Sequence, residues 1–279
     1  VTATAEDLSG LTSTCTAEVT VEDNIAPTAV CLSGVTVTQD ATGMSTVEVS
    51  DIDGGSSDNC GFSMSVNPSQ LSCEDGTTST TVTLTVTDDS GQSTTCTSDV
   101  TLIDVTGPMV TCSPITIQLD ANGQASILPV HLNQMITGTD NCSIFGDMEI
   151  SLSTHSGLLN CNDVGPNDIE VMLTDESNNS SVCTSTVTVE DNVAPEAICT
   201  DVLVVLDNAG QGALSVQDVD GGASDACGIA SMTIPVDYTQ LDCSDLGVHV
   251  LSLDVIDVHG NLSSCDFELS VEDNTKPIV

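Results

Sequence analysis

The sequence predicts an all-β protein made of tandem immunoglobulin-like antiparallel β-sandwiches joined end to end. A proline-terminated acidic linker recurs around Asp23, Asp104, Asp191 and Asp273, at spacings of 81, 87 and 82 residues. Between the linkers, short runs of alternating apolar and small polar residues are separated by turn signals roughly every 8 to 12 residues. No segment keeps a 3.6-residue apolar period, so helix should be scarce.

The linkers divide the chain into repeats. They read VEDNIAP at 21–27, VEDNVAP at 189–195 and VEDNTKP at 271–277, with the weaker copy LIDVTGP at 102–108. We call the three complete units the first, second and third repeats. The predicted boundaries are 1–22 for the last two strands of a split repeat, 23–103 for the first repeat, 104–190 for the divergent second repeat, 191–272 for the third repeat, and 273–279 for a linker and the start of the next repeat.

Strands follow from the alternation and the turns. TVTLTVT at 81–87 is the clearest alternating run, and DDSG at 88–91 is the tight turn that follows it. The strands expected in the split repeat and the first repeat cover residues 1–5, 11–21, 31–37, 44–50, 62–66, 79–87 and 93–102, with an acidic loop at 51–61.

The 13 cysteines comprise three sets of four and one further cysteine. Sets of four in domains of this size indicate an oxidising, extracellular setting. A zinc site is the alternative, but no set contains a CxxC pair and histidine is sparse. The first and last strands of an immunoglobulin-like sandwich run side by side, which favours pairing the first cysteine of a set with the fourth. The predicted disulfides are therefore Cys31–Cys96, Cys112–Cys183 and Cys199–Cys265, which leaves Cys60–Cys73, Cys142–Cys161 and Cys227–Cys243.

Cys15 is the odd cysteine, and by position it is the fourth of a repeat whose first three lie upstream. We expect the chain to be a window on a longer polymer, or its split repeat to be completed by strands of a neighbouring copy. The expected partners are therefore other copies of this chain, head to tail.

The charge excludes two classes of partner. With 42 acidic residues, one lysine and no arginine, the formal net charge of −41 argues against nucleic acid and against direct contact with an anionic membrane. Bound divalent cations would keep acidic clusters together, although a solvated acidic surface is the simpler interpretation for scattered aspartates.

Two acidic loops carry the calcium prediction. DIDGGSSDN at 51–59 and DVDGGASD at 218–225 place alternate aspartates around glycines, and calcium takes six to eight oxygen ligands. In a sandwich this loop, the last hairpin turn and the entering linker lie at one end. The preceding repeat presents its first turn at the same place; in the second repeat that turn lies near Asp120 and Asn122. The candidate calcium ligands are Asp23, Asp51, Asp53, Asp58, Asp88, Asp191, Asp218, Asp220, Asp225 and Asp257.

The linker before the second repeat has lost its glutamate and asparagine, and the loop positions of Asp51 and Asp53 become Asn133 and Met135. Only Asp104 and Asp140 remain, so calcium is predicted at the first and third linkers. Hydrogen-bonded turns or other cations are the alternatives.

Other functional signals are weak. His131, His155, His249 and His259 are isolated and should occupy ordinary surface or strand positions, and no nucleophile, phosphate-binding or cofactor motif is present. Asn141, Asn178, Asn179 and Asn261 begin N-glycosylation acceptor motifs, and exposed Ser and Thr leave O-linked sugar open.

The run from VEDNVAPEAIC through LDNAGQGALSVQDVDGGASDACGIAS to DVHGNLSSCDFELSVEDN resembles the hyalin-repeat-like (HYR-like) immunoglobulin-type modules of large secreted bacterial surface proteins. The linker is also similar to the calcium-binding Asp-x-Asn-Asp-x-Ala-Pro joints of cadherins. The resemblance implies cell adhesion or a structural stalk rather than catalysis. Together with the calcium predicted from the acidic loops, this leads us to expect a calcium-stiffened extracellular rod that serves as the repeating unit of a filament. A carbohydrate-binding array attached to a secreted enzyme is the alternative, and surface glycans would be its partners.

Overall fold

A computed structural model describes residues 1–73 and 79–276; the predicted start of a further repeat at 277–279 lies outside these ranges. The chain divides into two compact units. Unit 1 contains residues 1–108, 139–148 and 174–179, and unit 2 contains 109–138, 149–173 and 180–279. Unit 1 therefore includes two loops of the second repeat. Among the described residues, no helix is long and apolar enough to span a membrane.

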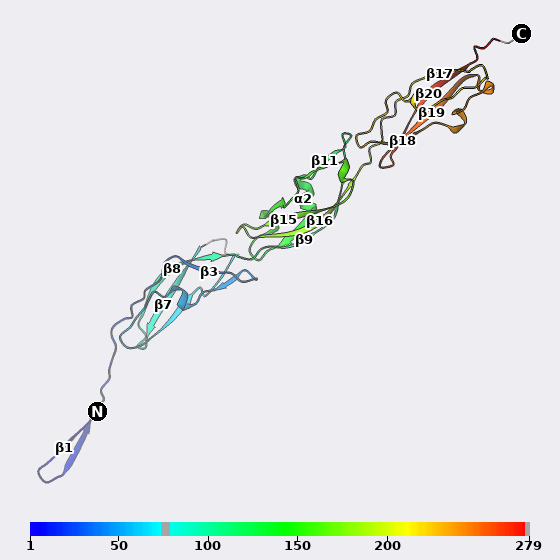
Figure 1. Cartoon of the computed structure of the whole chain (residues 1–279). Coiled ribbons are helices and arrows are strands. Elements are labelled where there is room, and N and C mark those ends of the chain that lie inside the picture. The colour runs from blue at the N-terminus through cyan, green and yellow to red at the C-terminus, as the bar shows by residue number, and fades with distance from the viewer. Residues whose placement is uncertain (74–78, 277–279) are drawn as a thin grey trace. The chain divides into compact units, whose positions relative to one another are not determined.

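Residues 2–16 form a hairpin whose register pairs Ala3 with Cys15. The strand expected over 11–21 ends at Thr16, and residues 17–22 belong to no strand. The first repeat has a four-stranded sheet in the order β3-β8-β7-β5, of which Figure 1 labels β3, β7 and β8. A smaller layer is formed by β4 and β6. The elements of these residues are β1 (Thr2–Glu6), β2 (Thr12–Thr16), β3 (Val35–Thr38), β4 (Met44–Thr46), α1 (Val49–Ile52), β5 (Phe62–Asn67), β6 (Gln70–Ser72), β7 (Ser79–Asp88) and β8 (Ser93–Ile103).

The core of the first repeat follows from the alternation in β7. Val82, Leu84 and Val86 are fully buried, while the threonines between them point to the other face. Ile52 of α1 and Leu71 of β6 belong to the same core cluster. The alternation predicted at 81–87 thus places a valine-rich core between two layers.

The second and third repeats use the same topology, with sheets in the orders β10-β16-β15-β13 and β17-β20-β19-β18 (Figure 1). The buried face of the third repeat includes Leu253, Val255 and Leu269. The remaining elements are β9 (Met109–Cys112), β10 (Ile115–Gln118), β11 (Gln124–Ser126), α2 (Pro129–Met135), β12 (Ile136–Thr139), η2 (Phe145–Asp147), β13 (Glu149–Leu152), β14 (Leu158–Asn160), η3 (Cys161–Asp163), β15 (Gly165–Thr174), β16 (Ser180–Glu190), β17 (Val202–Val205), α3 (Val216–Val219), β18 (Ile229–Thr233), η4 (Val236–Tyr238), η5 (Cys243–Asp245), β19 (Gly247–Asp257) and β20 (Leu262–Glu272).

The all-β, tandem immunoglobulin-like prediction is confirmed, with one difference. The first long strand of each repeat pairs in parallel with the last: β3 with β8, β10 with β16, and β17 with β20. In a sandwich of about seven alternating strands, the first and last strands point the same way, so their pairing is parallel.

One short helix interrupts the predicted loop region of each repeat. In the first repeat the strand expected over residues 44–50 ends at Thr46, and α1 follows. The backbone N–H of Glu48 donates to the Asp51 side chain at 2.8 Å, which satisfies a donor at the start of this single turn. The sequence shows no helical period here because one turn is too short to show one.

The disulfides both agree and disagree with the prediction. Cys31–Cys96, Cys112–Cys183 and Cys199–Cys265 are present, as the strand argument predicted. The predicted pairings Cys60–Cys73, Cys142–Cys161 and Cys227–Cys243 are wrong: Cys73 bonds to Cys142 and Cys161 bonds to Cys227, whereas Cys15, Cys60 and Cys243 are free and exposed.

The geometry of β5 explains the error. Cys60 lies just before this six-residue strand and Cys73 lies beyond it, after β6. At about 3.3 Å per residue the strand alone carries the chain roughly 20 Å, farther than a disulfide can reach. The third cysteine of one repeat therefore bonds to the second cysteine of the next repeat.

Candidate cation sites at the acidic joints

Three aspartates gather at the start of each repeat, and within each group one ligand oxygen of every residue lies within 4.8 Å of the others. One comes from the linker, one from the acidic loop and one from the last hairpin turn. We call these groups the first joint (Asp23, Asp58, Asp88), the second joint (Asp104, Asp140, Asp175) and the third joint (Asp191, Asp225, Asp257). The first two belong to unit 1 and the third to unit 2.

A side-chain amide four residues after each hairpin aspartate donates hydrogen bonds both to that aspartate and to the linker backbone. Gln92 Nε2 donates to Asp88 Oδ2 and to the backbone oxygen of Asp23, each at 3.2 Å. Asn179 makes the equivalent bonds to Asp175 at 3.0 Å and to the Asp104 backbone oxygen at 3.2 Å. These bonds fix the linker against the turn before any ion is considered.

The loop aspartate is oriented by the backbone that follows it. Asp140 Oδ2 accepts from the N–H groups of Cys142 and Ser143, both at 2.9 Å. In the first joint Asp58 Oδ2 accepts from the N–H of Cys60 at 2.9 Å and more weakly from that of Gly61. This turn uses one carboxylate oxygen and points the other into the joint.

Several joint oxygens are buried without any hydrogen-bond partner. They are Asp58 Oδ1 in the first joint, and Asp104 Oδ2, Asp140 Oδ1 and the amide oxygen of Asn141 in the second. An unpaired buried polar atom ordinarily costs about 1–3 kcal/mol, and more for a charged group. Two carboxylates about 4.8 Å apart also repel by roughly 3–4 kcal/mol at an effective dielectric of about 20.

The chain has little with which to neutralise this charge. Lys276 is its one lysine and arginine is absent. Carboxylate and amide oxygens are the ligands that hard divalent cations, calcium above all, take in proteins. The orphaned oxygens of the first two joints therefore fit a bound calcium ion.

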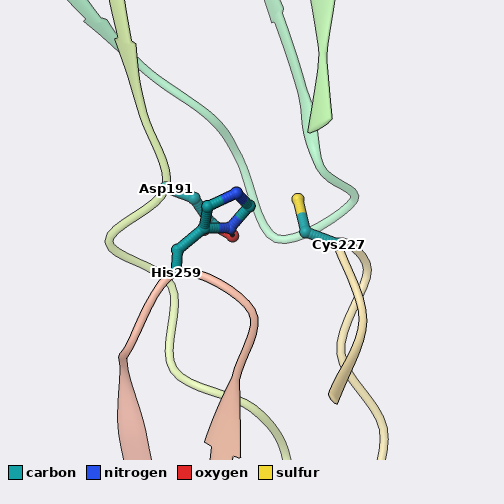
Figure 2. A group of neighbouring side chains, drawn as sticks. All are labelled: Asp191, Cys227 and His259. Carbon is teal, nitrogen blue, oxygen red and sulfur yellow. Dashed lines mark hydrogen bonds and ion pairs between the residues drawn. The ribbon is translucent and has the colours of Figure 1, made fainter. Parts of the chain in front are cut away.

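The third joint differs because a histidine enters it. His259 Nδ1 lies 2.9 Å from Asp191 Oδ2, and the Asp191 side chain is 2% exposed (Figure 2). His259 is exposed in the last hairpin turn, as its predicted surface position implies, but its contact with Asp191 was not predicted. Its isolation in the sequence hid a contact made across 68 residues.

Cys227 also lies within reach of Asp191 and His259 (Figure 2), but its sulfur is bonded to Cys161 and is not a ligand. Asp257 is buried in the same joint. Burial would raise the pKa of this carboxyl, but hydrogen bonds from Asn261 and the backbone of the turn outweigh it and hold the pKa below its usual value. Asp257 thus carries a charge beside Asp191 and Asp225.

Four of the predicted calcium ligands make other contacts and belong to no group of three. Asp51 bonds the Glu48 N–H, and Asp218 bonds the N–H and hydroxyl of Ser215 at 2.9 and 2.6 Å. Asp53 accepts from the Ser56 N–H at 2.9 Å, and Asp220 from the Ala223 N–H at 2.7 Å. These residues shape the helix start and the glycine turn.

The first turn of the preceding repeat does approach the next joint. Asn141 Nδ2 donates to the backbone oxygen of Asp40 at 3.2 Å. In unit 2, Asn122 lines a pocket with Asp225 and Ala226, whereas the Asp120 side chain bonds its own turn. Of the two residues expected here, Asn122 is therefore the one that faces the joint.

The sequence interpretation missed Asp175. The second joint looked degenerate because Asn133 and Met135 replace the aspartates found at the positions of Asp51 and Asp53. Those positions belong to no group of three described residues in any repeat. Asp175 was visible as a pattern, because Asp88, Asp175 and Asp257 each precede a side-chain amide by four residues. All three hairpin members of the groups share that spacing, although it also occurs at Asp120, Asp163 and Asp207, which belong to no group of described residues.

No family model and no curated protein matches the chain. Solved structures of low similarity include the protocadherin GammaB4 extracellular domain, at 16% identity and a TM-score of 0.32, covering 97% of this chain and 59% of that one. Mouse cadherin-23 EC22-24 matches at 12% identity and a TM-score of 0.34, covering 86% and 95%. The titin I67–I69 variant matches at 8% and 0.35, covering 88% and 98%. The chain spans about three fifths of the protocadherin GammaB4 structure.

The joints also bear on the predicted glycosylation sites. The side-chain amides of Asn141, Asn179 and Asn261 donate hydrogen bonds within the joints, so a glycan on any of them would break those bonds. Asn178 is exposed at the tip of its turn. It is the acceptor that the fold leaves accessible.

Replacing Asn261 with alanine should lower the free energy of unfolding of unit 2 by about 2 kcal/mol. Asn261 Nδ2 donates to Asp257 Oδ2 at 2.7 Å and to the backbone oxygens of Asp191 and Val193 at 3.0 and 3.2 Å, and Asp257 is 1% exposed. Urea denaturation measures the change. Leu262→Ala is the control, because Leu262 is 58% exposed and its loss should cost under about 0.5 kcal/mol.

Proposed function

We propose that this chain is an extracellular structural or adhesive repeat array whose joints bind calcium. Five disulfides support an oxidising, secreted or cell-surface location. The tandem immunoglobulin-like fold and the HYR-like resemblance of the linkers and loops support a structural role. The proposed domains are the three repeats at 23–103, 104–190 and 191–272, flanked by the split repeat at 1–22.

The observation that carries the proposal is the set of buried, unpartnered oxygens in the second joint. Asp104, Asp140 and Asn141 each leave one such oxygen, and Asp175 adds a buried carboxylate. An arrangement with no cationic side chain is stable only if something else supplies the charge. A divalent ion supplies it at the point where the linker meets the acidic loop and the last turn.

The residues that would hold calcium are the three aspartates of each joint, joined in the second joint by Asn141. Bound calcium would supply positive charge that draws these side chains together. The chain's own residues fix the joint in two further ways. The amides of Gln92, Asn179 and Asn261 clip turn to linker, and the Cys73–Cys142 and Cys161–Cys227 disulfides connect consecutive repeats.

This proposal predicts that calcium stabilises the whole chain. Each occupied joint should contribute about 2.7 kcal/mol when free calcium is 100-fold above its Kd, so Tm rises in calcium and falls in EGTA. Differential scanning calorimetry measures it. Sodium chloride at matched ionic strength is the control for screening. An equal rise in sodium and in calcium would assign the effect to the net charge and overturn the proposal.

The carbohydrate-binding alternative receives no support from the aromatic side chains. Sugar platforms use exposed aromatic faces, and the chain has one tyrosine and three phenylalanines. Tyr238 packs against His249 with ring centroids 5.3 Å apart, and Phe267 is buried. Phe62 is 38% exposed and Phe145 is half-buried. The expectation that the chain is not an enzyme stays a prediction.

A further inference from the structure

Two of the three free cysteines occupy positions that are bridged elsewhere in the chain. Cys73 and Cys161 are the third cysteines of their repeats and each bonds to the second cysteine of the next. Cys243 is the third cysteine of its repeat and Cys60 is a second cysteine, yet both are free and exposed. Cys243 and Cys60 are therefore a third and a second cysteine, the two positions that the observed cross-repeat disulfides join.

The third-cysteine site is built the same way in all three repeats. The leucine two residues earlier is 2% exposed in each case: Leu71, Leu159 and Leu241. The sulfur then lies 3.5, 3.7 and 3.9 Å from the backbone oxygen of Gly43, Gly123 and Gly210, respectively.

The turns around Cys161 and Cys243 are also capped alike. In the 3-10 turn of Cys161, the Asn160 N–H donates to Asp163 at 2.8 Å. In the turn of Cys243, the Asp242 N–H donates to Asp245 at 2.8 Å. Cys243 is therefore held in the conformation that Cys161 uses to form its bridge.

The glycine beside the third cysteine makes room for the partner. A Cβ on Gly43 would meet the backbone of Asn141, and one on Gly123 would meet Ala226, which are the residues just before the bridged second cysteines. A Cβ on Gly210 would meet Cys243 and no other described atom within 4 Å. The equivalent space beside Gly210 and Cys243 is therefore not occupied by any other described residue.

The second-cysteine site is likewise repeated. The N–H groups of Cys60, Cys142 and Cys227 donate to the aspartate two residues before, at 2.9, 2.9 and 2.7 Å. Asn59 precedes Cys60 as Asn141 precedes Cys142. Asn59 and Cys60 thus match the second-cysteine segments that lie beside Gly43 and Gly123 in the bridged copies.

We propose that Cys243 and Cys60 are the two ends of a disulfide made between this array and another repeat of the same kind, with a second copy of the chain joined head to tail as its partner. This names the partner of the array proposed above, but the bond itself does not depend on calcium. The Cys243 thiolate attacks a small disulfide such as oxidised glutathione and releases one glutathione thiolate. The Cys60 thiolate of the other copy attacks the mixed disulfide at the Cys243 sulfur and releases the second, so two protein thiols are oxidised and one glutathione disulfide is reduced.

The test uses the whole chain with its native disulfides intact and Cys15→Ser as the background. Oxidised glutathione should convert this protein into a ladder of dimers and longer species on a non-reducing gel. Adding Cys60→Ser or Cys243→Ser should leave each variant monomeric alone, and a 1:1 mixture of the two should give dimer and nothing longer. Dimer from either variant alone, or none from the mixture, overturns the proposal.

Each mixture is run in calcium and in EGTA, with about 1 M salt in both so that charge repulsion between copies is screened. Dimer in both conditions, together with an unchanged Tm in calcium, would uphold the bridge and reject the calcium joints. Melting that responds to calcium without any dimer would reject the bridge alone.

Non-reduced peptide mapping of the native protein distinguishes the sources of the partner. A Cys60 peptide joined to a Cys243 peptide identifies a second copy. One joined to a sequence outside the printed chain identifies another repeat of a longer polypeptide and supports the same bridge. Cys60 recovered as an alkylated free thiol, or joined to Cys15, overturns it.

Discussion

On the calcium proposal, Asp140→Asn is expected to remove one calcium-binding event from the chain, with a loss of at least about 100-fold in affinity at the second joint. The fold survives, because the asparagine side-chain oxygen can still accept the Cys142 and Ser143 N–H groups. What disappears is the charge on the buried, unpartnered Oδ1. Isothermal titration with calcium measures the loss as a reduced stoichiometry.

A matched pair of variants in the acidic loop of the first repeat distinguishes a joint aspartate from a neighbouring aspartate. Asp58 and Asp53 lie five residues apart in one loop, and the sequence predicted both as ligands. Asp58→Asn should abolish a binding event, whereas Asp53→Asn should change calcium affinity by less than about twofold, since Asp53 bonds the Ser56 N–H outside the joint. Equal effects from the two variants would show that calcium follows overall charge.

The two aspartates differ in a way that the sequence cannot show. Both belong to a DxDGG…D run, and that run suggests a single loop wrapped around one ion. In the structure, the glycine turn points Asp53 back at its own backbone, and the partners of Asp58 come from residues 35 positions before it and 30 after it. A sequence pattern indicates residues that are close together in the chain, whereas the aspartates of this site come from three separate segments that the fold brings together.

Topology was nonetheless the part of the fold that the sequence predicted best. The alternation at 81–87 and the turn at 88–91 placed β7 within one residue of its observed bounds, Ser79–Asp88. Because the linker, the acidic loop and the last turn share one end of a sandwich, Asp23, Asp58 and Asp88 could be expected to converge. The sequence interpretation missed the contact of His259 with Asp191, which spans 68 residues, and it missed Asp175, whose pattern is apparent only when the hairpins are aligned.

The cysteines show the limit of reasoning within a single repeat. Sets of four invite pairing within the set, and the 13-residue interval between Cys60 and Cys73 makes that pairing look natural. A six-residue strand between the two cysteines separates them. The structure closes larger loops instead, with sequence separations of 69 and 66 residues for Cys73–Cys142 and Cys161–Cys227.

Loop size gives the cross-repeat disulfides a large expected effect. In the chain-entropy account, a closed loop of about 66 residues reduces the entropy of the unfolded chain enough to contribute roughly 4 kcal/mol. The double variant Cys161→Ser with Cys227→Ser should therefore lower the free energy of unfolding of unit 2 by about that amount. Both cysteines belong to this unit, together with the cores of the second and third repeats, so urea denaturation followed by circular dichroism is the measurement.

Cys243→Ser is the matched control, because Cys243 lies in the same capped turn as Cys161 but forms no bond in the described chain. It should change stability by under about 0.5 kcal/mol. The Cys243→Ser variant distinguishes the observed connectivity from the one that proximity suggested. If Cys227 were bonded to Cys243, then Cys243→Ser would destabilise the chain by breaking that bond, whereas in the observed connectivity it breaks none. A large loss from the Cys161 and Cys227 change beside a neutral Cys243 change means that a disulfide connects the second and third repeats covalently.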